Sequence, residues 1–445
     1  MTSTSNEPLI LDPAEPDPTA PAQGGGGPSR RRKKARLVDQ PRIPLTLELT
    51  GFAHGGYAIS RAPDGRIVFV SYGIPGERVV AEITAEAPSY IEATAVLILE
   101  ASPHRVAPPC GYFGAGVGQQ CGGCQLQHIA YPEQLRLKTE VVREQLRRIG
   151  RFEDPPVEEM LGMVGPGGPW GYRNHMRFTV RRDGDVGFMQ RGTHRFLKIE
   201  ECQLALPAVN KALATMQGRT SGTRQASVRV GERTGDLLVQ PSLHWRPGRT
   251  RKLQSGQLFL HEELMGQRYR VSAPAFFQVN TRQAEALVSI ALDRLLLIEP
   301  RVVVDAYSGV GTFAALLAPE VDRVITIEAQ AAAGDDAGIN LREFTNITRL
   351  VGDVATVLPG LEPSPDALII DPPRAGVVRA VLDGIIASTA RRVVYVSCEP
   401  ATLARDLRIL VDAGFELVEV QPVDMFPQTQ HIECVAVLDR VSRTA

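Results

Sequence analysis

Between residues 301 and 398, short apolar runs alternate with helical stretches, and this alternation limits the fold more narrowly than any other feature of the chain. The runs are rich in Val and Ile, and helical stretches such as 331–344 and 377–388 separate them. Such an order predicts a parallel sheet with right-handed crossovers. Two further runs, 415–420 and 432–438, predict an antiparallel finish, so the expected fold class of this part is α/β.

A carboxylate closes each of the first four runs. These acids are Asp305, Glu328, Asp353 and Asp371. Because the carboxyl ends of parallel strands share one sheet edge, where open α/β sheets bind ligands, the four acids indicate a ligand site. Gly309 and Gly311 would let the backbone approach a nucleotide closely, although a purely structural turn explains this pair equally well.

Cys398 lies where the last parallel run, 392–396, ends and a helix begins, with Pro400 in the first turn of that helix. A thiol in this place faces the ligand-binding edge of the sheet. We expect the N–H groups at the helix start to lower its pKa, which favours the reactive thiolate. A lone cysteine is nevertheless more often a small buried core residue, so the functional interpretation depends on the neighbouring motifs.

Five motifs occur in the order found in one enzyme family. They are FFQVN at 276–280, DAYSGVGTF at 305–313, DPPRAG at 371–376, SCEPATLARD at 397–406 and HIE at 431–433. With them, residues 42–440 resemble the RNA 5-methyluridine methyltransferases, which transfer a methyl group from S-adenosylmethionine to uracil C5. The resemblance implies a Rossmann-like, S-adenosylmethionine-dependent methyltransferase domain over 271–445. It also implies an RNA substrate, with 23S rRNA favoured over tRNA.

The resemblance further implies which residues act. Cys398 is implied to add to C6 of the uracil and so activate C5, and Glu433 to remove the C5 proton afterwards. Asp371 and Arg374 are implied to orient the flipped uracil. The residues implied to contact S-adenosylmethionine are Gln278, Tyr307, Thr312, Glu328, Asp353 and Asp371. From the pattern alone, Glu433 could instead lie on the exposed face of an edge strand.

Two residues depart from the family pattern without replacing a catalytic group. Ser308 stands where cysteine is common, and Glu399 stands where asparagine usually follows the nucleophile. An N-methyltransferase would favour an aromatic residue in place of Arg374, and a cytosine-C5 enzyme would have proline or threonine before Cys398. The alternatives kept open are a tRNA enzyme and a catalytically inactive RNA-binding or RNA-folding protein.

Four other cysteines predict a metal centre. Cys121 and Cys124 form a Cys-x-x-Cys pair, with Cys110 upstream and Cys202 downstream. No secretory signal is apparent, so we expect a reducing cytoplasm, where such a group binds a metal. Four thiolates suit zinc and an iron–sulfur cluster equally well. The segment 121–128 resembles the family members with a [4Fe–4S] cluster, but the first two cysteines are farther apart here, and this insertion could displace Cys110.

The N-terminal part predicts a separate small domain. Short β-rich runs cut by Gly and Pro between 42 and 102 predict an OB-like β-barrel. The PGERV turn at 75–79 resembles the TRAM domain, an RNA-binding module of the cluster-bearing family members. Residues 1–41 are poor in apolar side chains and end in the basic run 30–34, which predicts a disordered basic tail.

Residues 103–270 are expected to form an α+β central domain that includes an amphipathic helix at 131–150. Within it, the stretch 173–198 has seven basic residues against two acidic ones, an excess of five, with aromatic side chains interleaved. The basic residues are Arg173, Arg177, Arg181, Arg182, Arg191, Arg195 and Lys198, and the aromatic ones are His175, Phe178, Phe188, His194 and Phe196. This composition predicts contact with RNA phosphates and unpaired bases, with an ordinary charged surface as the alternative.

Composition limits the function further. The 445 residues suffice for two or three domains, and a formal net charge of −1 requires any RNA site to be local. No apolar run approaches the roughly 18 residues of a membrane helix. We therefore expect no membrane partner. We also expect the protein to be a monomer.

Overall fold

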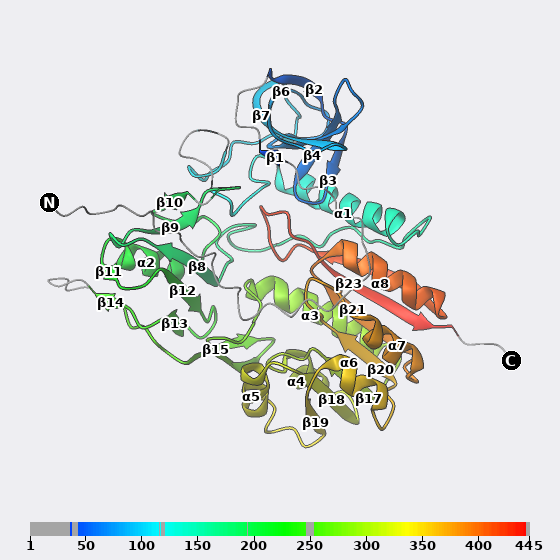
Figure 1. Cartoon of the computed structure of the whole chain (residues 1–445). Helices are drawn as coiled ribbons and strands as arrows, with labels where there is room; N and C mark the ends of the chain where they lie inside the picture. Colours follow the sequence, from blue (N-terminus) through cyan, green and yellow to red (C-terminus); the bar gives the residue numbers. More distant parts are fainter. Residues whose placement is uncertain are drawn as a thin grey trace, which may run out of the picture.

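The computed structural model describes residues 36–37, 43–114, 116, 121–193, 195–245 and 253–441. These residues form an N-terminal curled sheet, a central sheet and a C-terminal sheet layered with helices (Figure 1). The predicted disordered tail, with its basic run 30–34, lies outside the described residues except for 36–37. In the described part, no helix is both long and apolar enough to cross a membrane.

The C-terminal unit is a seven-stranded sheet of order β19-β18-β17-β20-β21-β23-β22. Its parallel strands are β17 (Val302–Ala306), β18 (Arg323–Glu328), β19 (Ile347–Val351), β20 (Ala367–Ile370) and β21 (Arg392–Ser397). The antiparallel strands are β22 (Phe415–Val423) and β23 (Glu433–Arg440). The predicted α/β, Rossmann-like fold with its antiparallel finish is confirmed.

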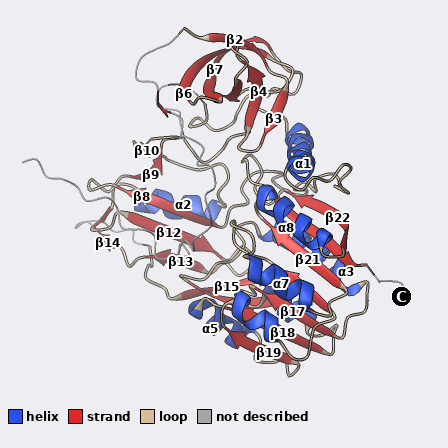
Figure 2. Ribbon diagram, turned by 45° about the vertical axis from the view of Figure 1, so that its right-hand side comes forward, coloured by secondary structure: helices blue, strands red, loops and turns tan. Residues whose placement is uncertain are grey.

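Helices cover both faces of this sheet (Figure 2). They are α3 (Thr281–Leu296), α4 (Thr312–Leu317), α5 (Ala331–Asn340), α6 (Val354–Val357), α7 (Arg379–Ala387) and α8 (Pro400–Asp412), with a short 3-10 turn η1 (Leu358–Gly360). Alternate strand residues enter two cores: Val303 packs with α3, α4 and α5, whereas Val304 packs with α7 and α8. Burial on both faces explains why the sequences of β17, β18, β20 and β21 are largely unbroken apolar runs.

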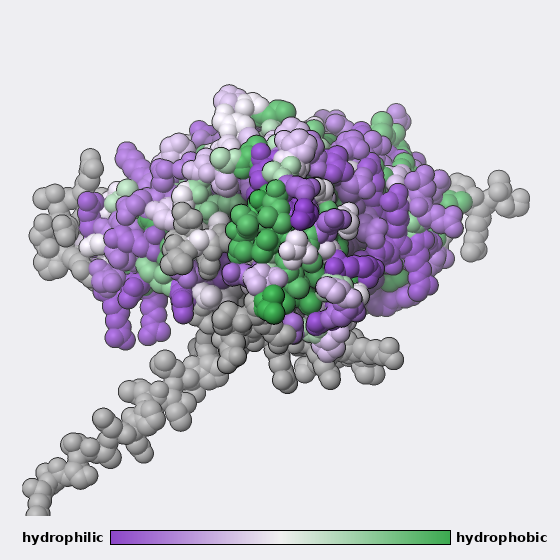
Figure 3. All heavy atoms as spheres, turned by 90° about the horizontal axis from the view of Figure 1, so that it is seen from above, coloured by the Kyte–Doolittle hydropathy of each residue, from purple (hydrophilic) through white to green (hydrophobic). Residues whose placement is uncertain are grey.

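The N-terminal sheet curls around a core of its own. Its strands are β1 (Arg36–Leu37), β2 (Leu45–Glu48), β3 (Gly51–Ala53), β4 (Tyr57–Arg61), β5 (Ile67–Ser71), β6 (Arg78–Glu86) and β7 (Tyr90–Glu100). Residues such as Val68 and Val79 fill the core. On the outside, β7 exposes Val96, Leu97 and Leu99, and Figure 3, which looks onto this end of the molecule, shows apolar side chains gathered there.

The central unit contains a five-stranded antiparallel sheet of order β10-β9-β8-β12-β13, covered by α2 (Pro207–Met216). These strands are β8 (His175–Val180), β9 (Val186–Met189), β10 (Phe196–Lys198), β12 (Gln225–Val230) and β13 (Leu237–Gln240). Two small ribbons pair β11 (Thr220–Ser221) with β14 (His244–Trp245), and β15 (Phe259–Leu264) with β16 (Gln267–Ser272). The helix expected at 131–150 is α1 (Tyr131–Arg148), which packs against α8 of the C-terminal unit.

Candidate active site

A cavity of about 480 Å³ opens at the carboxyl ends of the parallel strands. It lies where the strand order reverses, because β17 pairs with β18 on one side and with β20 on the other. Such a switch point is where open α/β sheets bind ligands. The cavity brings together most of the residues singled out from the sequence, namely Gln278, Tyr307, Thr312, Glu328, Asp371, Arg374, Cys398 and Glu433.

The glycine turn after β17 is held by the carboxylate of Glu328. Its two oxygens accept hydrogen bonds from the Gly309 N–H at 2.8 Å and from the Gln330 N–H at 2.6 Å. Gly311 caps α4 at a φ of 87°, and a Cβ there would come within 2.9 Å of Leu341, so this position requires glycine. Tyr307 itself has a φ of 63°, an uncommon backbone conformation for a side chain of this size.

The other two strand-end acids do not line this cavity. Asp305 is buried inside β17, where its carboxylate accepts from the Ala314 N–H, and burial raises its pKa to about 8. Asp353, expected to contact S-adenosylmethionine, is exposed and caps α6 by accepting from the Ala355 N–H at 2.9 Å. Both carboxylates therefore have a structural partner that the strand-end pattern did not predict.

Cys398 and Glu433 come from neighbouring strands, since Ser397 of β21 pairs with Cys434 of β23. Glu433 is only 6% exposed, so its alternative placement on an exposed strand face is wrong. Burial raises the pKa of Glu433 well above its ordinary value, and Asp371 adds repulsion while Arg374 opposes it. Burial likewise raises the pKa of Asp371 to about 7.

The pKa of Cys398 is also raised, to about 12, by burial first and then by the carboxyl groups of Glu433 and Asp371. The backbone N–H of Cys398 does lower this pKa, as predicted for the helix start, but the expected net decrease is wrong because burial outweighs it. At the start of α8, the side chain of Glu399 accepts from the Ala401 N–H, and desolvation of the thiol outweighs the remaining helix dipole.

Some residues at the site were not singled out from the sequence. Phe276 lines the cavity and is 66% exposed, and its only signal was the doubled phenylalanine before Gln278. His431 faces Arg374, with 3.5 Å between the imidazole Nδ1 and a guanidinium nitrogen. His54, from the N-terminal sheet, lies 3.5 Å from a carboxylate oxygen of Glu399, so the curled sheet touches the loop that carries the nucleophile.

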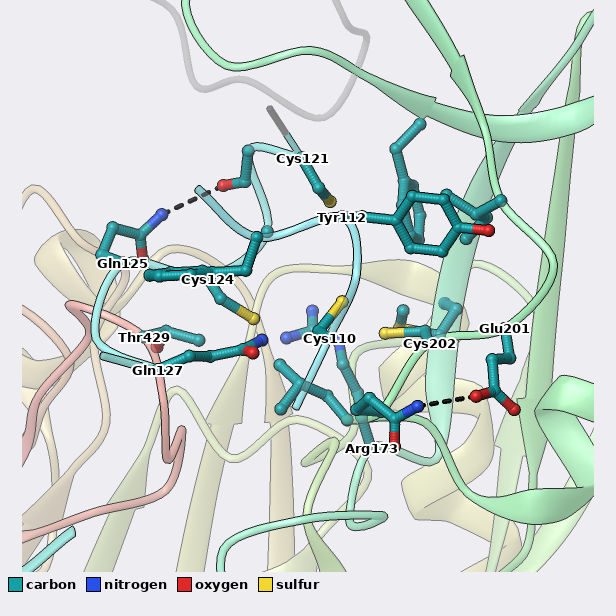
Figure 4. Close-up of a pocket in the computed structure, with 18 of the residues that line it drawn as sticks. Cys110, Tyr112, Cys121, Cys124, Gln125, Gln127, Arg173, Glu201, Cys202 and Thr429 are labelled. Carbon is teal, nitrogen blue, oxygen red and sulfur yellow. Dashed lines mark hydrogen bonds between the residues drawn. The ribbon is translucent and has the colours of Figure 1, made fainter. Parts of the chain in front are cut away.

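A second cavity of about 480 Å³ is lined by the segment 110–127, by the central unit and by residues 429–431 of the C-terminal unit. Its lining includes the four cysteines predicted as metal ligands, and their thiols point into it in Figure 4: Cys110, Cys121, Cys124 and Cys202. Cys110 joins the other three despite the insertion before Cys121. Among the described residues, no three His, Cys, Asp or Glu side chains lie close enough together for a single metal ion.

The basic stretch 173–198 is only partly available to RNA. Arg181 lies 3.8 Å from Asp183, and Lys198 pairs with Asp185 at 2.9 Å. Phe178 was expected to be able to stack on bases, but it is 1% exposed and packs in the central core against Phe188, so that expectation is wrong. The strand alternates, and β8 turns its apolar residues inward.

Arg173 and Arg177 of this stretch line the cysteine cavity. Arg181 also lies over the ring of Phe196, 5.5 Å from its centroid. The predicted His194 lies outside the described residues. Beside the cysteines, Arg177 is therefore exposed and Arg173 half-buried, while fewer aromatic side chains are available to stack on bases than the sequence indicated.

The sheet order and the cavity at its switch point define the class of this protein as a Rossmann-like α/β fold with a ligand site at the carboxyl ends of its strands. The solved structure of the tRNA (uracil-54, C5)-methyltransferase from Pyrococcus abyssi, in complex with S-adenosyl-L-homocysteine, has the same fold. It aligns with a TM-score of 0.67 and 24% identity over 88% of this chain and 100% of that chain.

The sequence comparisons narrow the class to a family. A family model described as tRNA (Uracil-5-)-methyltransferase matches residues 364–441. An RNA methyltransferase of Gloeobacter violaceus is 35% identical, and one of Halalkalibacterium halodurans is 34% identical; each match covers 89% of this chain and 96% of the relative. The chain belongs to the RNA uracil-5-methyltransferase family, and the prediction of an RNA methyltransferase is confirmed.

Proposed function

We propose that this enzyme methylates C5 of a uracil in 23S rRNA, in the cytoplasm, through a covalent adduct with Cys398. The observation that carries the proposal is the meeting of a thiol and a buried carboxyl group, Cys398 and Glu433, at adjacent ends of paired strands. Asp371 and Arg374 line the same cavity, where they would orient the uracil. A competing substrate is tRNA.

In the first step, the Cys398 thiol loses its proton to solvent and the resulting thiolate bonds to C6 of the uracil, while the C5–C6 π electron pair moves toward C5 and the C4 carbonyl oxygen. C5 thereby gains the nucleophilic character that uracil lacks, and one difficult step becomes two easier ones. Arg374 brings a guanidinium to the cavity, where its positive charge would stabilise the anionic adduct.

In the last step, the Glu433 carboxylate takes the proton from C5. The electrons of that C–H bond reform the C5–C6 double bond, and the Cys398 sulfur leaves as a thiolate. A raised pKa suits this role, because a carboxylate with a higher pKa is a stronger base toward carbon.

The same cavity offers groups for S-adenosylmethionine. Glu328, at a strand end beside a glycine turn, is placed to accept from ribose hydroxyls. Gln278, Tyr307 and Thr312 line the same cavity. Asp353 does not line it, and its carboxylate is proposed to accept a hydrogen bond from the adenine amino group of the bound S-adenosylmethionine. When bound, S-adenosylmethionine supplies the methyl group that C5 accepts between the two steps.

We also propose that the four cysteines of the second cavity bind a [4Fe–4S] cluster. Zinc bound at about 2.3 Å would hold the sulfurs roughly 3.8 Å apart, whereas the cluster's thiolates bind four different irons and lie farther apart. What supports the cluster is that all four cysteines line one cavity. Such a cluster would supply a cross-link between chain segments or a redox centre. The curled sheet at 42–102 is proposed to act as an RNA-binding TRAM module.

A methyl-transfer assay tests the proposed reaction. Anaerobically purified enzyme is mixed with S-adenosylmethionine and separate unmodified rRNA and tRNA pools, and nucleoside mass spectrometry identifies the product. We expect 5-methyluridine in the rRNA pool, none with Cys398→Ala, and a rate about 10²- to 10⁴-fold lower with Glu433→Gln. S-adenosylmethionine binding by Cys398→Ala should be retained. Near-wild-type turnover by Cys398→Ala would overturn the mechanism, and product in the tRNA pool alone would reassign the substrate.

A further inference from the structure

The loop 424–431 joins β22 to β23 and runs directly into Glu433, the first residue of β23. Figure 1 shows it in red beside α1. His431, at its end, lines the cysteine cavity and faces Arg374 of the active-site cavity. The conformation of this loop therefore determines the position at which β23 begins, and with it the position of Glu433.

One buried lysine on α1 ties both ends of the loop together. The Lys138 ammonium donates to the Asp424 carboxylate at 2.7 Å, to the Phe426 carbonyl at 3.3 Å and to the His431 carbonyl at 3.0 Å. All three ammonium protons are thus used, and Lys138 is only 1% exposed. A charge buried this deeply is costly unless it is fully paired, so its position is strongly determined.

The middle of the loop is held from the same helix face. Gln134, four residues before Lys138, donates to the Gln428 side chain at 2.9 Å and accepts from the Gln428 N–H at 3.2 Å. Gln428 has a φ of 69°, a backbone conformation that persists only where the surroundings impose it. Its carbonyl accepts from the N–H groups of Gln125 and Leu126, next to the Cys-x-x-Cys pair.

The start of α3 holds the remaining backbone. Asn280 donates to the Met425 carbonyl at 3.0 Å, and Gln283 donates to the Asp424 carbonyl at 3.1 Å. Polar side chains from two helices and the cysteine loop therefore hold a segment that has no regular structure of its own. Strained, over-determined backbone of this kind is typical of functional sites.

Resting on the proposed function, we propose that Lys138 is a positioning residue for the catalytic base. It holds the loop so that the Glu433 carboxylate meets the C5 proton of the methylated adduct. Cys398 stands on a different loop, so adduct formation does not depend on Lys138 in the same way. Loss of Lys138 therefore slows release of the product more than formation of the adduct.

The test uses Lys138→Met, which keeps the side-chain length and removes the charge. With RNA and S-adenosylmethionine, we expect a covalent protein–RNA adduct on denaturing gels at several times the wild-type amount, because the C5 proton leaves slowly. A displacement of about 1 Å can cost roughly 10²-fold in rate, so kcat should fall on that order while KM for RNA changes little.

Two further variants separate the outcomes. Arg105→Met leaves the buried Glu77 carboxylate in the N-terminal unit without its charged partner, as Lys138→Met does to the buried Asp424 carboxylate. Unlike Lys138, Arg105 does not hold the loop 424–431. Arg105→Met should lower the melting temperature without accumulating adduct. Glu433→Gln should accumulate adduct and serves as the reference.

If Glu433→Gln accumulates adduct and Lys138→Met does not, the inference is wrong while the proposed reaction stands. If Glu433→Gln turns over normally without adduct, the proposed reaction itself fails. Should Lys138→Met not fold, Gln134→Met removes the hydrogen bonds to Gln428 without leaving a buried charge unpaired. We expect it to accumulate adduct to a smaller extent, and wild-type kinetics in that variant would overturn the inference.

Discussion

At the scale of single residues, Cys398 rests as a protonated thiol. Its pKa of about 12 leaves little thiolate near neutral pH, although the thiolate is the reactive form. S-adenosylmethionine carries a positive sulfonium, and the residues proposed to hold it line the cavity that contains Cys398. A cation there would favour the ionised thiol, so the nucleophile would become active only when the methyl donor is present.

Alkylation of Cys398 measures this effect. At a pH of about 7.5, each unit by which the pKa falls raises the thiolate fraction roughly tenfold. We expect S-adenosylmethionine to speed iodoacetamide labelling of the Cys398 peptide about tenfold or more, as followed by mass spectrometry. S-adenosylhomocysteine, which has almost the same shape but no sulfonium charge, should not. Equal protection by both compounds would contradict this account.

The sequence predicted which residues would share the candidate site better than it predicted their ionisation. Cys398, Glu433 and Asp371 were singled out by motif, and the structure brings all three into one cavity. Their raised pKa values come from desolvation, which depends on segments packed over them from distant parts of the chain. Local sequence does not contain this information.

At the scale of elements, β8 and the turn that follows it present two arginines with different surroundings. Both Arg177 and Arg181 are exposed, but Arg181 lies near Asp183, whereas Arg177 lines the cysteine cavity. We expect Arg177→Glu to weaken RNA binding and to flatten its salt dependence by about one unit of slope. Arg181→Glu should have the smaller effect, because Asp183 already offsets its charge. Binding isotherms at several salt concentrations check this, and unchanged slopes in both variants would exclude the strand from the RNA site.

Strands and helices were predictable, but the loop 424–431 was not. The runs in β17, β18, β20 and β21 are rich in β-branched residues and buried on both faces, so their composition alone predicts the secondary structure. The loop depends on Lys138, which lies 286 residues before Asp424 in the sequence. A contact over that separation leaves no local pattern, and only the assembled fold shows it.

At the scale of the whole molecule, the proposed cluster would join two distant segments. Cys110, Cys121 and Cys124 follow the curled N-terminal sheet, whereas Cys202 precedes α2 of the central unit. A metal bound by all four would restrain how these units meet, and ligand binding to the folded state raises stability. The domain boundaries stay a prediction from the sequence. The meeting of residues 110–127, the central sheet and residues 429–431 around one cavity was not readable from it, because this depends on side chains from separate segments.

Metal analysis tests this arrangement. Anaerobically purified enzyme should contain about four irons per chain. Cys202→Ser should lose most of the iron and lower the melting temperature, whereas Cys434→Ser, which changes a buried core cysteine, should keep its iron. Stoichiometric zinc in place of iron, or full iron in Cys202→Ser, would overturn the proposed cluster.

The contact between His54 and Glu399 has a consequence for how such enzymes diversify. A turn of the N-terminal sheet touches the residue that follows Cys398 in the sequence. A chimera that receives its N-terminal unit from another relative would therefore give Glu399 a new neighbour. Exchange of this unit is then expected to change the surroundings of the loop that carries Cys398 as well as the outer surface of the sheet.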